Sequence, residues 1–272
     1  MQDFTIVCVL SNNTLMNLRW VRHHLSLFPP DFPVILVDNT TYFSRGQVLV
    51  DYLAAPRWGV IKDTLPLKPA SIPQTTLSHG EALDFATHFI TTPYIITIDN
   101  DCFLTSLQPI ELLLHHIRQE KVGVAGWEWW NTIIYPYIVP ILAAYRLEIA
   151  RQFKFHPRWA SPQQMSERYK PFYKPEYETQ DLYAAVRKQG YLDVGQYLHY
   201  EAELAGWQVV RLDLAALQDT AFHVGNASSS HLTLPQDPYA LKSLALPVAH
   251  VPPVPCRLYF TSSLPPDASW EP

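Results

Sequence analysis

Two aspartates stand directly after an apolar run in the middle of the chain, where Asp99-Asn100-Asp101 follows YIITI. Carboxylates at positions i and i+2 can converge on one point, and two anions held close together repel each other unless a cation or a shared proton intervenes. Oxygen ligands favour Mn²⁺ or Mg²⁺, which would also bind the phosphates of a substrate. Two solvated aspartates in a loop are the alternative. The position at the end of a predicted buried strand favours the metal site, because ligands bind beyond the carboxyl ends of parallel strands.

Two further polar residues are candidates for the same edge of a sheet. Asp38 ends the apolar segment PVILV, where a carboxylate can accept hydrogen bonds from a nucleotide base or ribose. The simpler interpretation is an aspartate that forms a turn before Asn39. His223 lies in AFHVGN and is a candidate third metal ligand or phosphate contact, although a lone histidine is more often structural.

An acidic pair opens a predicted helix that Gly190 ends. Glu178 and Asp181 are three residues apart and therefore share a face. Both fall in the first turn, where acids stabilise the helix through its dipole. The functional alternative is that one of them is a general base.

An aromatic group follows the aspartates along the chain. Its members are Trp127, Trp129, Trp130, Tyr135 and Tyr137. Aromatic faces stack on the apolar C–H faces of sugars, which makes the tryptophans candidates for an acceptor site, and they fill hydrophobic cores equally well.

The elements that must position these residues follow from hydrophobic periodicity. The opening forty residues predict one βαβ unit, with strands at Phe4–Leu10 and Pro33–Val37 and a helix over Leu15–Leu27. Further strands are predicted at Trp58–Ile61, Tyr94–Ile98, Val122–Ala125 and Gln208–Leu212, and further helices at Leu77–Phe89, Ile110–Glu120, Thr179–Gln189 and Val194–Ala205. Alternating strands and helices predict an α/β fold with a mostly parallel central sheet flanked by helices.

Composition describes an ordinary protein of 272 residues, 48% hydrophobic, with a formal net charge of -5. No run of Lys or Arg suggests a nucleic-acid partner. Three widely spaced cysteines and an N-terminus without a basic region favour a reducing, cytoplasmic location. The segment Ile133–Tyr145 is too short to cross a bilayer and reads as a buried helix or a pocket wall, with a peripheral membrane contact as the less favoured alternative. Residues 1–231 form the expected domain, and the proline-rich residues 232–272 an appended tail, packed on it or partly disordered.

Taken in order, these segments resemble the inverting GT-A glycosyltransferases of the family 2-like type. In that family the polar turn after the first strand, the aspartate after the second, and a glycine before the helix that precedes the metal motif contact the nucleotide. An acidic helix start supplies the base, and a late histidine helps to hold the metal. The matching segments here are Thr5–Asn13, VILVDNTT, SHGEALDFATHFITTPYIITIDND, Glu178-Thr179-Gln180-Asp181-Leu182 and His223.

The resemblance implies a role for each matching residue. It assigns the nucleotide to Ser11, Asn13, Asp38, Gly80 and Asp99, the metal to Asp99, Asp101 and His223, the acceptor to Trp127, Trp129 and Trp130, and the base to Asp181, with Glu178 as the alternative. The chain departs from the family pattern where Leu10-Ser11-Asn12-Asn13 replaces Pro-Thr-Tyr-Asn and where Thr179 replaces an aspartate.

The implied reaction is transfer of a sugar, with inversion, from a UDP- or GDP-type sugar donor to a saccharide or other hydroxyl acceptor, with Mn²⁺ or Mg²⁺ as cofactor. Two alternatives remain. A sugar nucleotidyltransferase shares the sheet and the metal acids, but it normally carries a glycine-rich, basic loop that SNNTLMN lacks. The other alternative is a catalytically inactive binding protein of the same fold.

Overall fold

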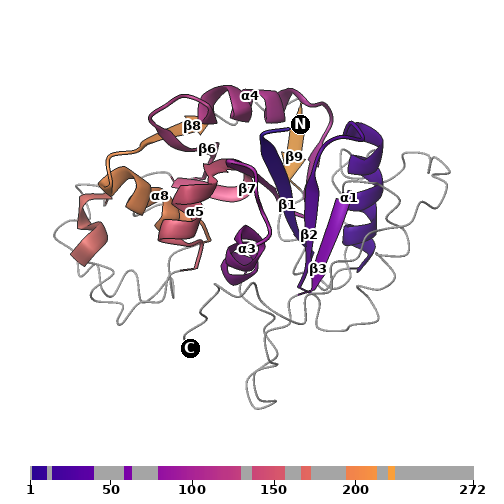
Figure 1. Cartoon of the computed structure of the whole chain (residues 1–272), viewed down its shortest axis with the longest axis horizontal. Helices are drawn as coiled ribbons and strands as arrows, with labels where there is room; N and C mark the ends of the chain where they lie inside the picture. Colours follow the sequence, from indigo (N-terminus) through magenta and orange to yellow (C-terminus); the bar gives the residue numbers. More distant parts are fainter. Residues whose placement is uncertain are drawn as a thin grey trace, which may run out of the picture.

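A seven-stranded mixed sheet forms the centre of the protein (Figure 1). The computed structural model describes residues 2–10, 14–39, 58–62, 79–129, 137–156, 167–172, 194–212 and 220–223. The strand order is β3-β2-β1-β4-β7-β6-β8, and the neighbours are parallel except where β7 pairs with β4 and with β6. The predicted α/β class with a mostly parallel sheet is therefore confirmed.

The N-terminal half has the predicted βαβ arrangement. Strand β1 (Phe4–Leu10) is buried along its whole length, as expected for an apolar run inside a parallel sheet. Helix α1 (Thr14–Leu27) connects it to β2 (Val34–Asp38), and β3 (Trp58–Lys62) pairs with β2 at the edge.

The remaining elements complete the other half of the sheet and its covering layers. They are α3 (His79–Thr87), β4 (Tyr94–Ile98), β5 (Cys102–Leu104), α4 (Gln108–Ile117), β6 (Val122–Trp129), β7 (Tyr137–Arg146), α5 (Leu147–Phe153), the 3-10 helix Lys170–Phe172, α8 (Gln196–Leu204), β8 (Gln208–Leu212) and β9 (Ala221–His223). Strands β5 and β9 form a separate antiparallel pair. The helix expected at Thr179–Gln189 and the tail 232–272 lie outside the described residues.

One prediction for this half is wrong. The helix expected within Ile133–Tyr145 is not formed, because the described residues of this segment, 137–145, lie in strand β7, which runs antiparallel between β4 and β6. The alternative expectation, a pocket wall, stays a prediction. Pro140 of β7 lies opposite the point where the pairing with β6 shifts register, between Gly126 and Glu128. It also lies beyond Leu142, the last residue of β7 that pairs with β4. A proline is tolerated there because the ladder is already interrupted.

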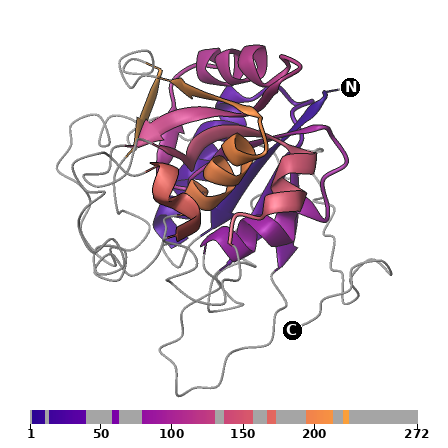
Figure 2. The same cartoon turned by 90° about the vertical axis from the view of Figure 1, so that its left-hand side faces the viewer.

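Helices cover both faces of the sheet. Helices α1 and α4 pack on one face through side chains such as Trp20 and Leu113. Helices α3, α5 and α8 pack on the other face through Leu83, Ile149 and Leu198, and Figure 2 shows this second group in front of the sheet. Among the residues described, no helix has both the length and the apolar character needed to cross a bilayer.

The topology marks one place on the sheet for a ligand. The chain leaves β1 toward β2 and β3 on one side, and then crosses to β4 on the other side of β1. Open sheets bind ligands where the strand order reverses in this way, beyond the carboxyl ends of the strands. That place lies beyond Leu10 and Ile98, where the segment Asp99-Asn100-Asp101 begins.

Candidate functional site

A tight turn at the end of β4 presents the two aspartates. The Asp99 N–H donates to the carbonyl of Ile141 on β7 (2.9 Å), and the Cys102 N–H donates to the carbonyl of Asp99 (2.9 Å). The chain therefore reverses over three residues into β5. This turn places both carboxylates at the carboxyl edge of the sheet, as the sequence predicted.

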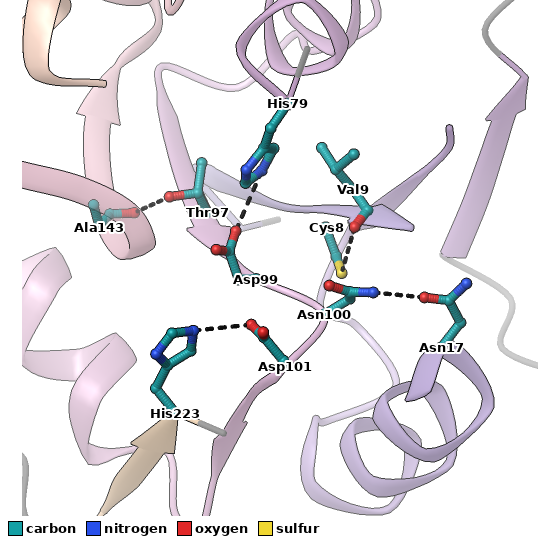
Figure 3. Close-up of polar contacts among 10 residues, drawn as sticks. All are labelled: Cys8, Val9, Asn17, His79, Thr97, Asp99, Asn100, Asp101, Ala143 and His223. Carbon is teal, nitrogen blue, oxygen red and sulfur yellow. Dashed lines mark hydrogen bonds and ion pairs between the residues drawn. The ribbon is translucent and has the colours of Figure 1, made fainter. Parts of the chain in front are cut away.

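Strand β9 brings a histidine to the same point. Cys102 on β5 pairs with His223 on β9, and the His223 ring lies beside Asp101 (Figure 3). The distance from His223 Nε2 to Asp101 Oδ1 is 3.0 Å, and Nε2 is the donor because an ionised carboxylate only accepts. Asp99, Asp101 and His223 each offer one ligand atom, and these atoms lie within 4.8 Å of one another.

The electrostatics of this group suit a divalent cation. Burial lowers the pKa of His223, but the hydrogen bond that His223 donates to Asp101 and the charges of Asp101 and Asp99 outweigh burial, so that its pKa is raised. The imidazole therefore lies beside two negative charges, and Asp101, which carries one of them, is almost fully buried. Two carboxylates and one imidazole are a donor set that accommodates Mn²⁺, and the residues present therefore fit the metal that the sequence predicts.

Two cysteines of the described chain lie near this group but are not part of it. Cys8 and Cys102 are both buried free thiols. Burial, and then the charges of Asp99 and Asp101, raise the pKa of each thiol well above its usual value. The thiolate is the metal-binding form, so both remain neutral core side chains.

Helix α1 holds the middle of the turn and the strand that follows it. The buried Asn100 donates from Nδ2 to Oδ1 of Asn17 on α1 (2.7 Å). Farther along α1, His23 Nε2 lies 2.5 Å from the carbonyl of Leu104, and His24 Nε2 accepts the N–H of Leu104 (3.4 Å). The helix therefore anchors both the turn and β5.

Sequence reasoning missed one residue of the site. His79, the first residue of α3, lies with Nε2 3.2 Å from Oδ1 of Asp99 (Figure 3). The signal available in the sequence was limited to its position immediately before Gly80. Nothing in the spacing connects a histidine at a helix start to an aspartate that follows the next strand.

Two predicted nucleotide contacts have known positions. Asp38 ends β2 at the carboxyl edge of the sheet, although its side chain is not among those described. Gly80 lies in the first turn of α3, where a Cβ would meet the Phe155 carbonyl oxygen and the His156 Cβ at 3.0 Å. This close approach gives the glycine a packing role, and contact with a nucleotide stays a prediction for both residues.

The predicted acceptor and catalytic residues are mostly outside the described part of the chain. Trp127 on β6 is 7% exposed and packs in the core, and Trp129 ends that strand at the carboxyl edge. The side chain of Trp129 and the residues Trp130, Ser11, Asn13, Glu178 and Asp181 are not described. Their roles stay predictions.

Comparison with known proteins yields structural likenesses only. The sequence matches no protein-family model, and no match appears among curated proteins. Solved structures similar to the chain include mannosyltransferase PcManGT from Pyrobaculum calidifontis in complex with GDP-Man and Mn²⁺ (11% identity, 78% of this chain and 55% of that chain, TM-score 0.49). A second is glycosyltransferase GlyE from Streptococcus pneumoniae TIGR4 (10% identity, 89% of this chain and 61% of that chain, TM-score 0.49).

A third similar structure is S. aureus TarS 1-349 in complex with UDP-GlcNAc (13% identity, 57% of this chain and 49% of that chain, TM-score 0.39). The chain therefore spans between about half and three fifths of the length of these proteins. Two of these proteins are described as glycosyltransferases, and the third was solved with a nucleotide sugar bound. Sequence identities of 10 to 13% do not establish a family for this chain.

Proposed function

We propose that the protein is a cytoplasmic, metal-dependent glycosyltransferase of the GT-A type that takes a sugar from a nucleotide diphosphate sugar. The observation that carries the proposal is the group formed by Asp99, Asp101 and His223 at the point where the strand order of the sheet reverses. A site of oxygen and imidazole donors at this edge is suited to hold a cation against the phosphates of a ligand that enters from the carboxyl ends of the strands.

Each residue of the group has a distinct part in this proposal. Asp99 and Asp101 would hold Mn²⁺ or Mg²⁺, and His223 would complete the protein's share of the ligands. When bound, the cation neutralises the charge that develops on the nucleotide diphosphate as it leaves. Asp101 is almost fully buried, and the low dielectric of such surroundings would strengthen this electrostatic contribution.

The surrounding residues would bind the two substrates. Asp38 ends the strand next to β1 and would accept hydrogen bonds from the base or ribose of a UDP- or GDP-type donor. Ser11, Asn13 and Gly80 would line the same nucleotide site. The acceptor, a saccharide or another hydroxyl compound, would stack against the aromatic segment that includes Trp129.

The base would be a carboxylate within hydrogen-bond reach of the acceptor hydroxyl, on the side opposite the leaving group, which gives inversion. We assign this role to Asp181, with Glu178 as the alternative. Replacement of Asp181 by Asn should lower turnover by about 10²-fold or more without changing donor affinity. A loss of that size with Glu178→Gln instead would move the role to Glu178.

The metal site is tested by binding of UDP and GDP with and without Mn²⁺. Asp101→Asn should abolish the Mn²⁺-dependent part of the binding, because it removes an anionic ligand while keeping the shape of the side chain. Glu120→Gln replaces an exposed acid between α4 and β6; it is the matched control and should bind like the wild type. Equal Mn²⁺-dependent affinity in wild type and Asp101→Asn would refute the metal site.

Turnover by the wild type is tested separately, as release of UDP or GDP from a panel of sugar donors in the presence of metal. If the wild type binds UDP or GDP but releases neither from any donor, the protein is a binding protein.

A further inference from the structure

The three residues of the turn after β4 are held by three different elements. Asp101 contacts β9 and Asn100 contacts α1, as described above. Asp99 contacts His79 at the start of α3, on the side of its carboxylate away from β9 (Figure 3). The contacts to β9 and α1 have clear roles in holding the turn together, whereas the contact to His79 has no role in the function proposed above.

We propose that His79 is a positioning residue that orients the carboxylate of Asp99 toward the bound cation. This inference rests on the metal site of the proposed function and adds a residue that acts through one of its ligands. An ionised carboxylate can only accept, so the hydrogen in the 3.2 Å contact is on Nε2 of His79. A neutral imidazole supplies that donor, and the inference therefore requires no charge on the ring.

His79 is not itself one of the ligands. The group whose donor atoms lie within 4.8 Å of one another consists of Asp99, Asp101 and His223, and the ring of His79 is not part of it. Carboxylates that bind metals are commonly hydrogen-bonded in turn by a neighbouring side chain, which sets their orientation. His79 has the position of such a neighbour.

The backbone around His79 is placed by close packing. The next residue, Gly80, approaches the segment that follows α5 so closely that a Cβ there would lie 3.0 Å from the carbonyl oxygen of Phe155. The start of α3 therefore has little room to shift relative to the sheet. The ring of His79 is presented to Asp99 from a rigid support, which is what positioning of a ligand requires.

Orientation matters here because the two aspartates repel each other. Asp99 is 18% exposed at its side chain and Asp101 only 3%, so that Asp99 is the carboxylate with room to rotate toward solvent. A donor on its outer side opposes that rotation and keeps Asp99 beside Asp101 before the cation arrives. Loss of the donor should therefore weaken binding of the cation even in the absence of any nucleotide.

The experiment measures Mn²⁺ binding to the full chain by calorimetry and by the electron paramagnetic resonance signal of free Mn²⁺. His79→Ala should weaken binding of Mn²⁺ alone by about 10- to 100-fold, the usual effect of removing a hydrogen-bonding partner of a ligand. His79→Gln should restore affinity to within about threefold of the wild type, because the amide of Gln can donate from nearly the same position. The melting temperature without metal should change little, since His79 is 30% exposed and its truncation opens no core cavity.

His156→Ala is the matched control, because His156 lies near the same helix start, is 44% exposed and contacts Glu81 rather than an aspartate of the turn. It should leave Mn²⁺ affinity unchanged. Wild-type affinity in His79→Ala, together with its loss in Asp101→Asn, would overturn the role of His79 and leave the metal site intact. Equal weakening in His79→Ala and His79→Gln would also overturn it, because the hydrogen bond would then not be the cause. Absence of Mn²⁺ binding by the wild-type chain would overturn the metal site itself and this inference with it.

Discussion

His24 on α1 provides a test of how the support of the site depends on pH. The ring is fully buried. Its Nδ1 donates to the carbonyl of Trp20 (2.9 Å), and its Nε2 accepts the N–H of Leu104 on β5 (3.4 Å), which together define a neutral imidazole. Burial and the neighbouring His23 lower the pKa of His24 well below its usual value, against the opposite effect of the Trp20 carbonyl.

The direction and size of the effect follow from proton linkage. When the pKa of a base is lower in the folded state, the unfolded state binds a proton more readily, so the folded state loses stability as the pH falls through the unfolded pKa, here 6.5. Between about pH 7.5 and about pH 5.5 the unfolded chain takes up a proton on His24 that the folded chain does not. Integrated over that interval, the free energy of unfolding should fall by about 1.4 kcal/mol through this residue alone.

Urea unfolding followed by tryptophan fluorescence at the two pH values measures this loss. The variant His24→Gln removes the titrating group and keeps an acceptor for the N–H of Leu104. On lowering the pH, the wild type should lose about 1.4 kcal/mol more than this variant. His115→Gln, which replaces an exposed histidine of α4, should keep the wild-type pH dependence. If His24→Gln loses as much stability as the wild type, the folded protein accepts a proton on His24 and the reasoning is wrong.

Three further substitutions have expected outcomes in the same unfolding assay. Burial raises the pKa of Asp84 to about 7 despite two backbone hydrogen bonds that lower it, so between about pH 5 and about pH 7 the folded chain retains a proton that the unfolded chain releases. As the pH rises over that interval, the free energy of unfolding of the wild type should fall by about 2 kcal/mol more than that of Asp84→Asn. A difference between the two proteins that does not change with pH would contradict this. Asn17→Ala removes the acceptor 2.7 Å from Asn100 and should lower the free energy of unfolding by about 1–3 kcal/mol, so an unchanged value would show that this contact does not hold the turn. Gly126→Ala places a Cβ 2.6 Å from that of Ala143 and should destabilise the protein by about 1–3 kcal/mol, and wild-type stability would mean that β6 and β7 can separate without strain.

The elements that could be predicted from the sequence are those whose hydrophobic pattern is typical of only one type of secondary structure. Unbroken apolar runs such as Phe4–Leu10 and Tyr94–Ile98 became the buried strands β1 and β4, and the turn with two aspartates followed directly from the end of β4. Strand β7 was not recognised, because Pro136 and Pro140 are atypical of a central strand. Pairing with two neighbours overrode the local preference of that segment.

The sequence predicted the three residues that gather at the candidate metal site, but not the residues that support them. The two aspartates and His223 could be found because their residue types are typical of metal binding. Asn17 and His79 belong to helices that reach the turn only through the packing of the sheet. Neither residue has a distinctive spacing relative to the aspartates, so that contact through tertiary structure was the only evidence for them.

On the proposed function, the pairing of β5 with β9 would set the order in which the protein acquires its cation during synthesis. His223 follows Asp101 by 122 residues, so a growing chain exposes both aspartates long before the imidazole leaves the ribosome. Until then a cation can find only the two carboxylates, in a turn whose partner strand does not yet exist. A ribosome-bound chain stalled just after β8 would therefore hold Mn²⁺ weakly, and tight retention of the ion would mark the moment when β9 has joined the fold.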